Sequence, residues 1–160
     1  MLPKSLGRPT PLFRLATALL AAMVVFSSAA IAQLDVLGRQ VTVFGVLATP
    51  KGKTIDPKLK PVEDQLKKLL PNHGFKLVKI ESKRLNTGEI LPCDLTSGFV
   101  ASSQLVQAID PNGKVQLRVG LSYNGVVQYQ SLVSTPPNQI FFYDKQLPNG
   151  ERLVIGIGAR

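Results

Sequence analysis

The sequence predicts an α+β protein that is mostly β: an antiparallel sheet or small β-sandwich with one packed amphipathic helix, preceded by a signal-peptide helix. Three observations lead to this class. After the N-terminal segment, apolar residues recur at helical spacing in one stretch only. Runs rich in β-branched residues fill most of the remaining chain. Short turns join these runs, whereas a doubly wound parallel sheet would need helices between its strands.

The N-terminal segment has the three parts of a secretory signal. Residues 1–14 contain basic residues and no acid, and residues 15–26 are almost entirely apolar. Ala30 and Ala32 then form an A-x-A cleavage site before Gln33. We therefore expect residues 1–32 to be removed between Ala32 and Gln33, leaving an exported, periplasmic or extracellular domain of residues 33–160. The alternative is an uncleaved anchor, since residues 15–32 come close to the length that spans a bilayer.

The first two elements of this domain differ in their apolar period. Residues 39–49 carry apolar side chains at both parities, which is typical of an interior strand. The next segment, residues 57–70, changes to helical spacing, and Asp56 followed by Pro57 is a favourable helix start. Pro71 and Gly74 mark its end. The sequence thus predicts one amphipathic helix near residues 57–70. Because the Pro61 ring disfavours helical geometry at Lys60, the helix proper would begin at Pro61, with Glu63 and Asp64 in its first turn.

Strands are expected through the rest of the chain, at residues 75–82, 88–95, 104–109, 115–133, 139–144 and 151–158. The segment 115–133 is predicted to be a hairpin. A two-residue Asn-Gly turn would place Leu121 opposite Gln128 and mix the two faces. A three-residue loop, Tyr123 to Gly125, instead pairs Leu121 with Val127. Because register follows the buried face, we expect the longer loop.

Positive charge is concentrated in one part of the chain. The sequence has 19 basic and 10 acidic residues, and three of the basic residues lie in the leader, which leaves 16 against 10. The excess lies between Lys51 and Arg84, a stretch that could bind an anionic polymer or membrane surface. An alternative is a solvated face, in which Glu63 and Asp64 pair with the lysines four residues later. The candidate anion-binding residues are Lys67, Lys68, Lys76, Lys79, Lys83 and Arg84. Lysine predominance and a single aromatic residue in this stretch argue against a nucleic-acid partner.

Reactive side chains are few. The chain has one histidine, His73, and one cysteine, Cys93, and nothing in the sequence orients the two as a nucleophile and base. They are too few for a zinc site, so we expect no metal and no cofactor. An odd cysteine in an exported protein suggests an intermolecular disulfide through Cys93.

Aromatic residues cluster near the C-terminus, in the strand expected at residues 139–144. Phe141 and Tyr143 share one strand face and Phe142 takes the other. One set is expected in the core. The other would form an exposed aromatic patch for sugar or peptide stacking, unless the strand is buried on both sides.

The run from Ile55 to Lys79, "IDPKLKPVEDQLKKLLPNHGFKLVK", followed by a β-rich segment ending "GERLVIGIGAR", resembles small secreted bacterial proteins of no assigned activity. The resemblance implies an envelope or periplasmic β-rich module and brings no catalytic residues.

The sequence therefore favours an exported, non-catalytic binding module. It would bind or support a component of the cell envelope or of secretion, such as an envelope protein or an anionic polymer. One alternative is a basic adaptor for an anionic polymer or membrane through residues 51–84; membrane contact would otherwise need an uncleaved leader. A second alternative is a hydrolase whose site leaves no motif in the sequence.

Overall fold

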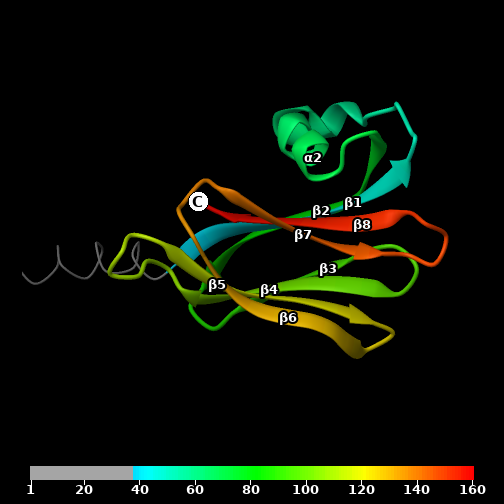
Figure 1. Ribbon diagram of the computed structural model, residues 1–160. Helices are drawn as coiled ribbons and strands as arrows, with labels where there is room; N and C mark the ends of the chain where they lie inside the picture. Colours follow the sequence, from blue (N-terminus) through cyan, green and yellow to red (C-terminus); the bar gives the residue numbers. More distant parts are fainter. Residues whose placement is uncertain (1–37) are drawn as a thin grey trace, which may run out of the picture. The chain divides into compact units, whose positions relative to one another are not determined.

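The computed structural model describes residues 38–160, which form two four-stranded antiparallel sheets packed face to face (Figure 1). The mostly β prediction is confirmed. Sheet A has the order β2-β1-β8-β7, and sheet B has the order β3-β4-β5-β6. The strands of sheet A are β1 (Gly38–Pro50), β2 (His73–Asn86), β7 (Ile140–Gln146) and β8 (Arg152–Ala159). Those of sheet B are β3 (Ile90–Asp94), β4 (Phe99–Gln107), β5 (Val115–Tyr123) and β6 (Val126–Thr135).

The central strand of sheet A, β1, is buried on both faces, as its sequence predicts. It pairs with β2 on one side and β8 on the other. Val41 and Val43 enter the core between the sheets, whereas Phe44, Val46 and Ala48 belong to a second core on the outer face of sheet A. Apolar residues at both parities are what a strand with two buried faces requires.

The helical segment covers this outer face and makes a third layer (Figure 1). It begins as a 3-10 helix, η2 (Pro57–Val62). Asp56 caps its start: Asp56 Oδ1 accepts a hydrogen bond from the Lys58 amide at 2.9 Å. The α-helix α2 (Glu63–Leu69) follows, with both acids in its first turn as expected. The predicted helix is thus confirmed, although its first half is 3-10. Its apolar stripe packs on sheet A through Leu59, Val62, Leu66 and Leu70.

One close contact holds the outer core together. The Phe44 ring lies directly over Gly156 of β8, where an added Cβ would be 2.3 Å from Phe44 Cζ. Gly156 therefore gives the ring its place on the sheet. Phe142 of β7 meets the same ring edge-on, with centroids 6.0 Å apart and planes at 83°. This aromatic pair joins β1 and β7 across β8.

The hairpin of β5 and β6 differs from the prediction. The turn is the two-residue one, with Asn124 and Gly125 at φ of 48° and 82°, the left-handed angles of a type I′ turn. Tyr123 pairs with Val126, and the register then shifts so that Leu121 pairs with Tyr129. The shift is a β-bulge that leaves Gln128 without an opposite residue, so that beyond it the inward-facing residues of β5 and β6 lie opposite one another. The three-residue loop was wrong because a bulge satisfies both the turn and the face.

Sheet B also contains a longer strand than the sequence indicates. β4 begins at Phe99, inside a stretch in which no strand is predicted before residue 104. Its inward positions include Ala101 and Ser103, both fully buried. Small and polar residues at core positions weaken the apolar alternation, and this hid the strand.

Replacing Leu66 with alanine should destabilise the protein by about 3 kcal/mol, because Leu66 is fully buried between α2 and sheet A. Leu69→Ala is the matched control: Leu69 is 40% exposed on the same helix, and its loss should cost less than about 1 kcal/mol. Urea unfolding followed by circular dichroism measures both. Equal losses for the two variants would contradict the packing of α2 described above.

Candidate functional site

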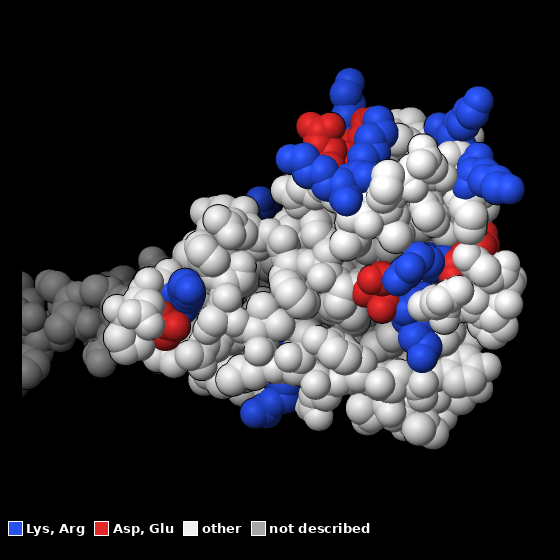
Figure 2. All heavy atoms as spheres, viewed as in Figure 1, with Lys and Arg blue, Asp and Glu red and all other residues white. Residues whose placement is uncertain are grey.

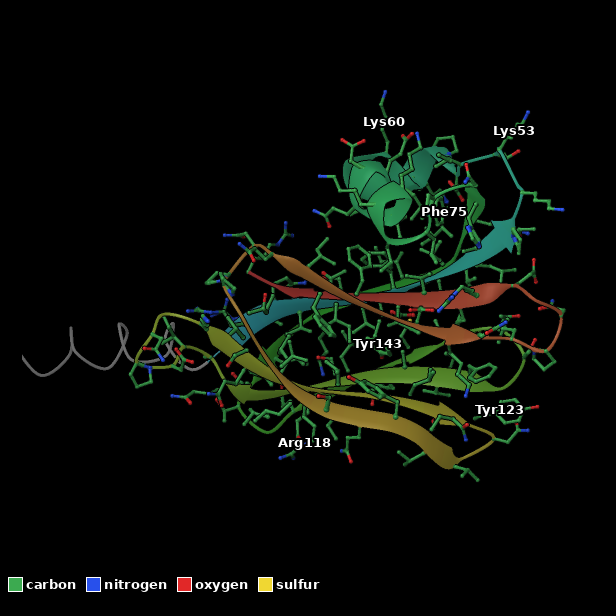
Figure 3. The ribbon with its side chains drawn as sticks, in the orientation of Figure 1. Lys53, Lys60, Phe75, Arg118, Tyr123 and Tyr143 are labelled. Atoms are coloured by element: carbon green, nitrogen blue, oxygen red, sulfur yellow. The ribbon has the colours of Figure 1, made fainter. Side chains whose placement is uncertain are left out.

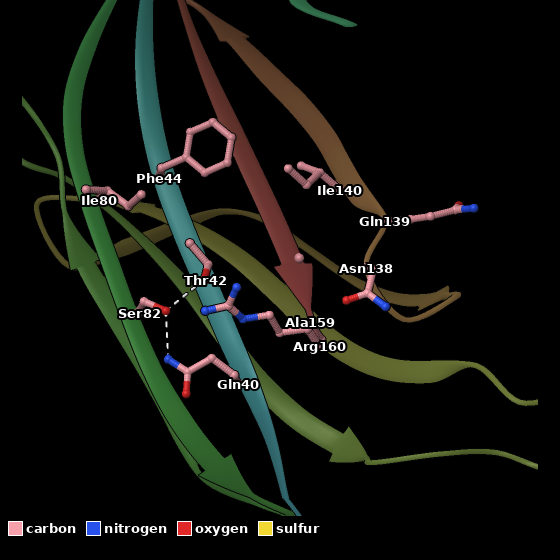
Figure 4. Close-up of a pocket in the computed structure, with 11 residues that line it drawn as sticks. Gln40, Thr42, Phe44, Ile80, Ser82, Asn138, Gln139, Ile140, Ala159 and Arg160 are labelled. Atoms are coloured by element: carbon pink, nitrogen blue, oxygen red, sulfur yellow. Dashed lines mark hydrogen bonds between the residues drawn. The ribbon is translucent and has the colours of Figure 1, made fainter. Parts of the chain in front are cut away.

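A groove runs along the part of sheet A that the helical segment leaves open (Figure 4). One cavity of about 460 Å³ has an apolar floor formed by Phe44 of β1, Ile80 of β2 and Ile140 of β7. A neighbouring cavity of about 190 Å³ shares these three residues and extends to Lys58 and Leu59 of η2. Together the two cavities form one groove, from η2 to the ends of β1 and β8.

Polar side chains form the far end of the groove. Gln40 Nε2 donates a hydrogen bond to Ser82 Oγ at 2.8 Å, and Ser82 Oγ lies 2.8 Å from Thr42 Oγ1 (Figure 4). The Arg160 side chain lines the same end. Its backbone is fixed by two hydrogen bonds to Gln40, of 2.9 and 3.0 Å. This end therefore offers amide, hydroxyl and guanidinium groups on a paired backbone.

The charged side chains in the groove are of one sign. Among the residues that line the two cavities, the only charged side chains are Lys58 and Arg160, one near each end. No aspartate or glutamate lines either cavity. The remaining polar lining consists of hydroxyl and carboxamide groups. The side chains of the groove therefore offer positive charge and neutral hydrogen-bonding groups.

Sequence reasoning missed this groove, but a signal for it was present. Along one face of β1, Gln40 and Thr42 are polar, whereas Phe44, Val46 and Ala48 are apolar. The change of polarity along one strand face marks the place where the helical cover ends. Ile80 lies at this boundary on β2, and 54% of its surface is exposed.

The six predicted anion-binding residues do not lie on one face. Lys67 and Lys68 are in the last turn of α2, and Lys67 forms an ion pair with Glu63. On β2, residues 76, 79 and 83 lie opposite β1 residues on the face toward sheet B. Arg84 lies opposite Gln40, on the face toward the groove. Lys79 also pairs with Glu81 at 3.2 Å. The predicted residues are therefore divided between α2 and the two faces of β2.

Basic side chains do gather over the helical layer (Figure 2). Lys53 and Lys60 point away from the domain (Figure 3). All six lysines of η2, α2 and the loop before them are exposed, and three acids accompany them, of which Asp56 is engaged as the helix cap. We call this surface the lysine cap: Lys51, Lys53, Lys58, Lys60, Lys67 and Lys68. It adjoins the groove, because Lys58 belongs to both.

The predicted aromatic patch is wrong, because β7 packs on both sides. Phe141 and Tyr143 pack against the core between the sheets, and Phe142 packs against the outer core. Tyr143 points between the sheets (Figure 3), where its hydroxyl donates to the Gly120 carbonyl at 3.0 Å. Burial raises the pKa of Tyr143 far above its usual range, and the nearby Tyr129 adds to this. These partly buried rings stabilise the sandwich.

The intermolecular disulfide through Cys93 is not available to the folded domain. Cys93 points into the core between the sheets and is 1% exposed. Burial, followed by the negative charge of Glu81, raises the pKa of this thiol to about 11. His73 begins β2, where its Nδ1 lies 2.9 Å from the Pro71 carbonyl, in the turn after α2. Neither residue is positioned as a nucleophile or its base.

Residues 38–160 contain no group of three or more His, Cys, Asp and Glu side chains that could hold a metal ion. Within the same range, no helix is long and apolar enough to cross a membrane. The predicted cleavage between Ala32 and Gln33 lies outside the described residues. No family model, curated protein or solved structure matches the chain.

The native thiol should be unreactive toward 5,5′-dithiobis(2-nitrobenzoate) near neutral pH, because the folded state keeps Cys93 buried and protonated until the pH approaches its raised pKa of about 11. Unfolding in guanidinium chloride should release one reactive thiol per chain. The absorbance of the released thiolate measures both states. A dimer on a non-reducing denaturing gel that disappears on reduction would instead support the intermolecular disulfide through Cys93.

Proposed function

We propose that this protein is an exported, non-catalytic binding module that holds an acidic, hydroxyl-rich polymer of the cell envelope in the groove of sheet A. The observation that carries the proposal is the lining of the groove: an apolar floor, hydroxyl and carboxamide groups, and charged side chains that are all cations. Export is supported by the secretory pattern of residues 1–32.

The lining suits a glycan with acidic groups. The C–H faces of sugar rings pack on apolar side chains, here Phe44, Ile80 and Ile140. Ring hydroxyls exchange hydrogen bonds with side chains such as Gln40 and Thr42. Carboxylate or sulfate groups would meet Arg160 at one end and Lys58 at the other. An elongated groove that is open along its length accommodates a polymer better than a compact metabolite, which pockets usually enclose.

The lining also argues for binding without catalysis. Hydrolysis of a glycosidic bond generally uses two carboxyl groups placed on either side of it, and neither cavity of the groove is lined by one. A serine hydrolase would need a histidine beside its nucleophile. His73, the only histidine, does not line the groove. A buried serine, Ser103, has no hydrogen-bond partner, but it lies in the core between the sheets.

Removing the charge at both ends of the groove should weaken binding of an acidic glycan. We expect Lys58→Gln with Arg160→Gln to raise the dissociation constant for alginate about tenfold, because two charge-assisted contacts are lost. Isothermal titration calorimetry of the full-length chain measures it, with dextran as the neutral probe. Lys145→Gln is the control, since Lys145 is a cation on β7 that does not line the groove.

A second pair of variants tests the floor of the groove. Ile80→Ser should weaken alginate binding, and Ile90→Ser should not. These isoleucines are 54% and 56% exposed, so both changes leave the cores intact, but Ile90 lies on β3 of sheet B. Alginate binding that withstands both the charge variant and Ile80→Ser would show that the groove is not the site, and the absence of any alginate binding would remove the proposed function.

The lysine cap supports a second candidate function, contact with an anionic membrane surface. All six of its lysines are exposed, and Figure 2 shows basic side chains, with acidic ones among them, over the helical layer. Clusters of basic side chains bind anionic lipid headgroups through charge that salt screens. In this candidate the protein rests on the membrane by its helical layer.

The division of the basic residues between layers gives a direct test. Lys67→Glu with Lys68→Glu should abolish salt-sensitive sedimentation with phosphatidylglycerol vesicles, because the change reverses two charges of the cap. Lys76→Glu with Lys79→Glu is the matched control on β2 and should have a smaller effect. Sedimentation that is unchanged by the first pair, or lost equally with both pairs, would argue against the cap as the contact surface.

A further inference from the structure

The four edge strands of the sandwich are protected unequally. An exposed strand edge presents unpaired N–H and C=O groups to other chains, and proteins usually block it with charges, proline or short length. Three of the edges here follow that rule. β2 carries Lys76, Lys79, Glu81, Lys83 and Arg84; β7 carries Asp144 and Lys145; and β3 is 5 residues long and contains Pro92 and Asp94.

The fourth edge, β6, has none of these protections. It is 10 residues long, contains neither a charged residue nor proline, and pairs with β5 alone among the described strands. Between Arg118 and Asp144 the sequence contains no charged residue at all. Leu132 is 57% exposed in the middle of the strand, and Val126 and Val127 are 64% and 66% exposed beside the turn. Arg118 of β5, opposite Leu132, is the one charged residue of the β5–β6 hairpin, and Figure 2 shows few charged side chains below the lysine-rich layer.

We propose that β6 is a dimerisation edge, on which a second copy of this chain adds its own β6 in antiparallel orientation. The charge distribution selects this partner. The excess positive charge of the chain lies between Lys51 and Arg84, so two copies repel each other where these residues would meet. They can approach without repulsion where charge is absent, and β6 is the one edge strand of the described domain with that property.

The residues of β6 also specify a register. In a two-fold pairing centred on Ser131, Tyr129 lies opposite Val133 of the second copy, and Gln130 lies opposite its Leu132. Tyr129 and Val133 belong to the parity that faces sheet A, because they pair with Leu121 and Leu117 of the core. Aromatic and β-branched residues are a favourable cross-strand pair. Centring on Gln130 would instead place Tyr129 opposite Ser131 and lose that contact.

Such a pairing closes on itself. Each β6 gains its second neighbour, and sheet B becomes part of one continuous eight-stranded sheet. The strands at its two ends are then copies of β3, which proline and aspartate protect. The assembly should therefore stop at two chains.

The test is sedimentation equilibrium of the full-length chain produced with its own leader. We expect a dimer whose mass does not increase further with concentration. Gln130→Lys places one charge next to the centre of the edge and should raise the dimer dissociation constant about tenfold or more, because each lysine then lies opposite the apolar Leu132 and diagonal to the lysine of the second copy. Asn112→Lys adds the same charge in the turn before β5 and should leave the dimer intact. Association through the leader would be equally strong in all three proteins.

An engineered cysteine tests the register. Ser131→Cys should form an intermolecular disulfide under mild copper–phenanthroline oxidation, since the two copies of residue 131 face each other; Asn112→Cys should not. A monomeric wild-type chain, assemblies larger than a dimer, or a Gln130→Lys variant as dimeric as the wild type would each overturn the proposal. If the chain is a monomer, a strand of another protein becomes the candidate partner of β6.

Discussion

The pairing of β1 with β8 is the interaction on which the rest of this domain depends. It joins strands from the two ends of the described chain, from Val41 opposite Ala159 to Ala48 opposite Arg152. One face of this pair is buried against sheet B, and the other face is buried against the helical layer from Phe44 to Ala48. Neither core can form without it, because each would lose the central strands that form its floor. The groove depends on the same pair, since it opens where the helical layer ends while the strands continue.

The parts of the fold that were predicted correctly are those whose signals are local. Helical spacing from Leu59 to Leu70, with Asp56 as the cap, is contained in one short segment. The two buried faces of β1 are likewise predicted by the apolar residues of its own sequence. The hairpin register was not predictable from alternation alone, because a bulge at Gln128 allowed the favoured Asn-Gly turn and face matching to coexist. β4 was hidden in part by Ser103, a polar residue whose burial depends on the strands on either side of it.

The candidate site followed the same rule. The basic stretch was visible because its residues are near one another in sequence, but the fold divides them between the helical layer and the two faces of β2. The groove draws on β1, β2, η2 and the segment around β7 and β8, so no single window of sequence contains it. Only the change from Thr42 to Phe44 along one strand face hints at it. A site formed by side chains from paired strands can be recognised only when the register of those strands is known.

The two proposals are physically compatible, since antiparallel pairing of two β6 strands reverses strand direction about an axis perpendicular to the sheet. Such an axis keeps equivalent faces on the same side. Both copies of sheet A, with their grooves and lysine caps, would then face in one direction. A polymer that reaches both grooves would bind the second as an intramolecular step, which raises its overall affinity without any new contact. The separation of charge in this chain, basic side chains on the helical layer and none on β6, suits both tasks: attraction of an acidic polymer on one face and self-association along an uncharged edge.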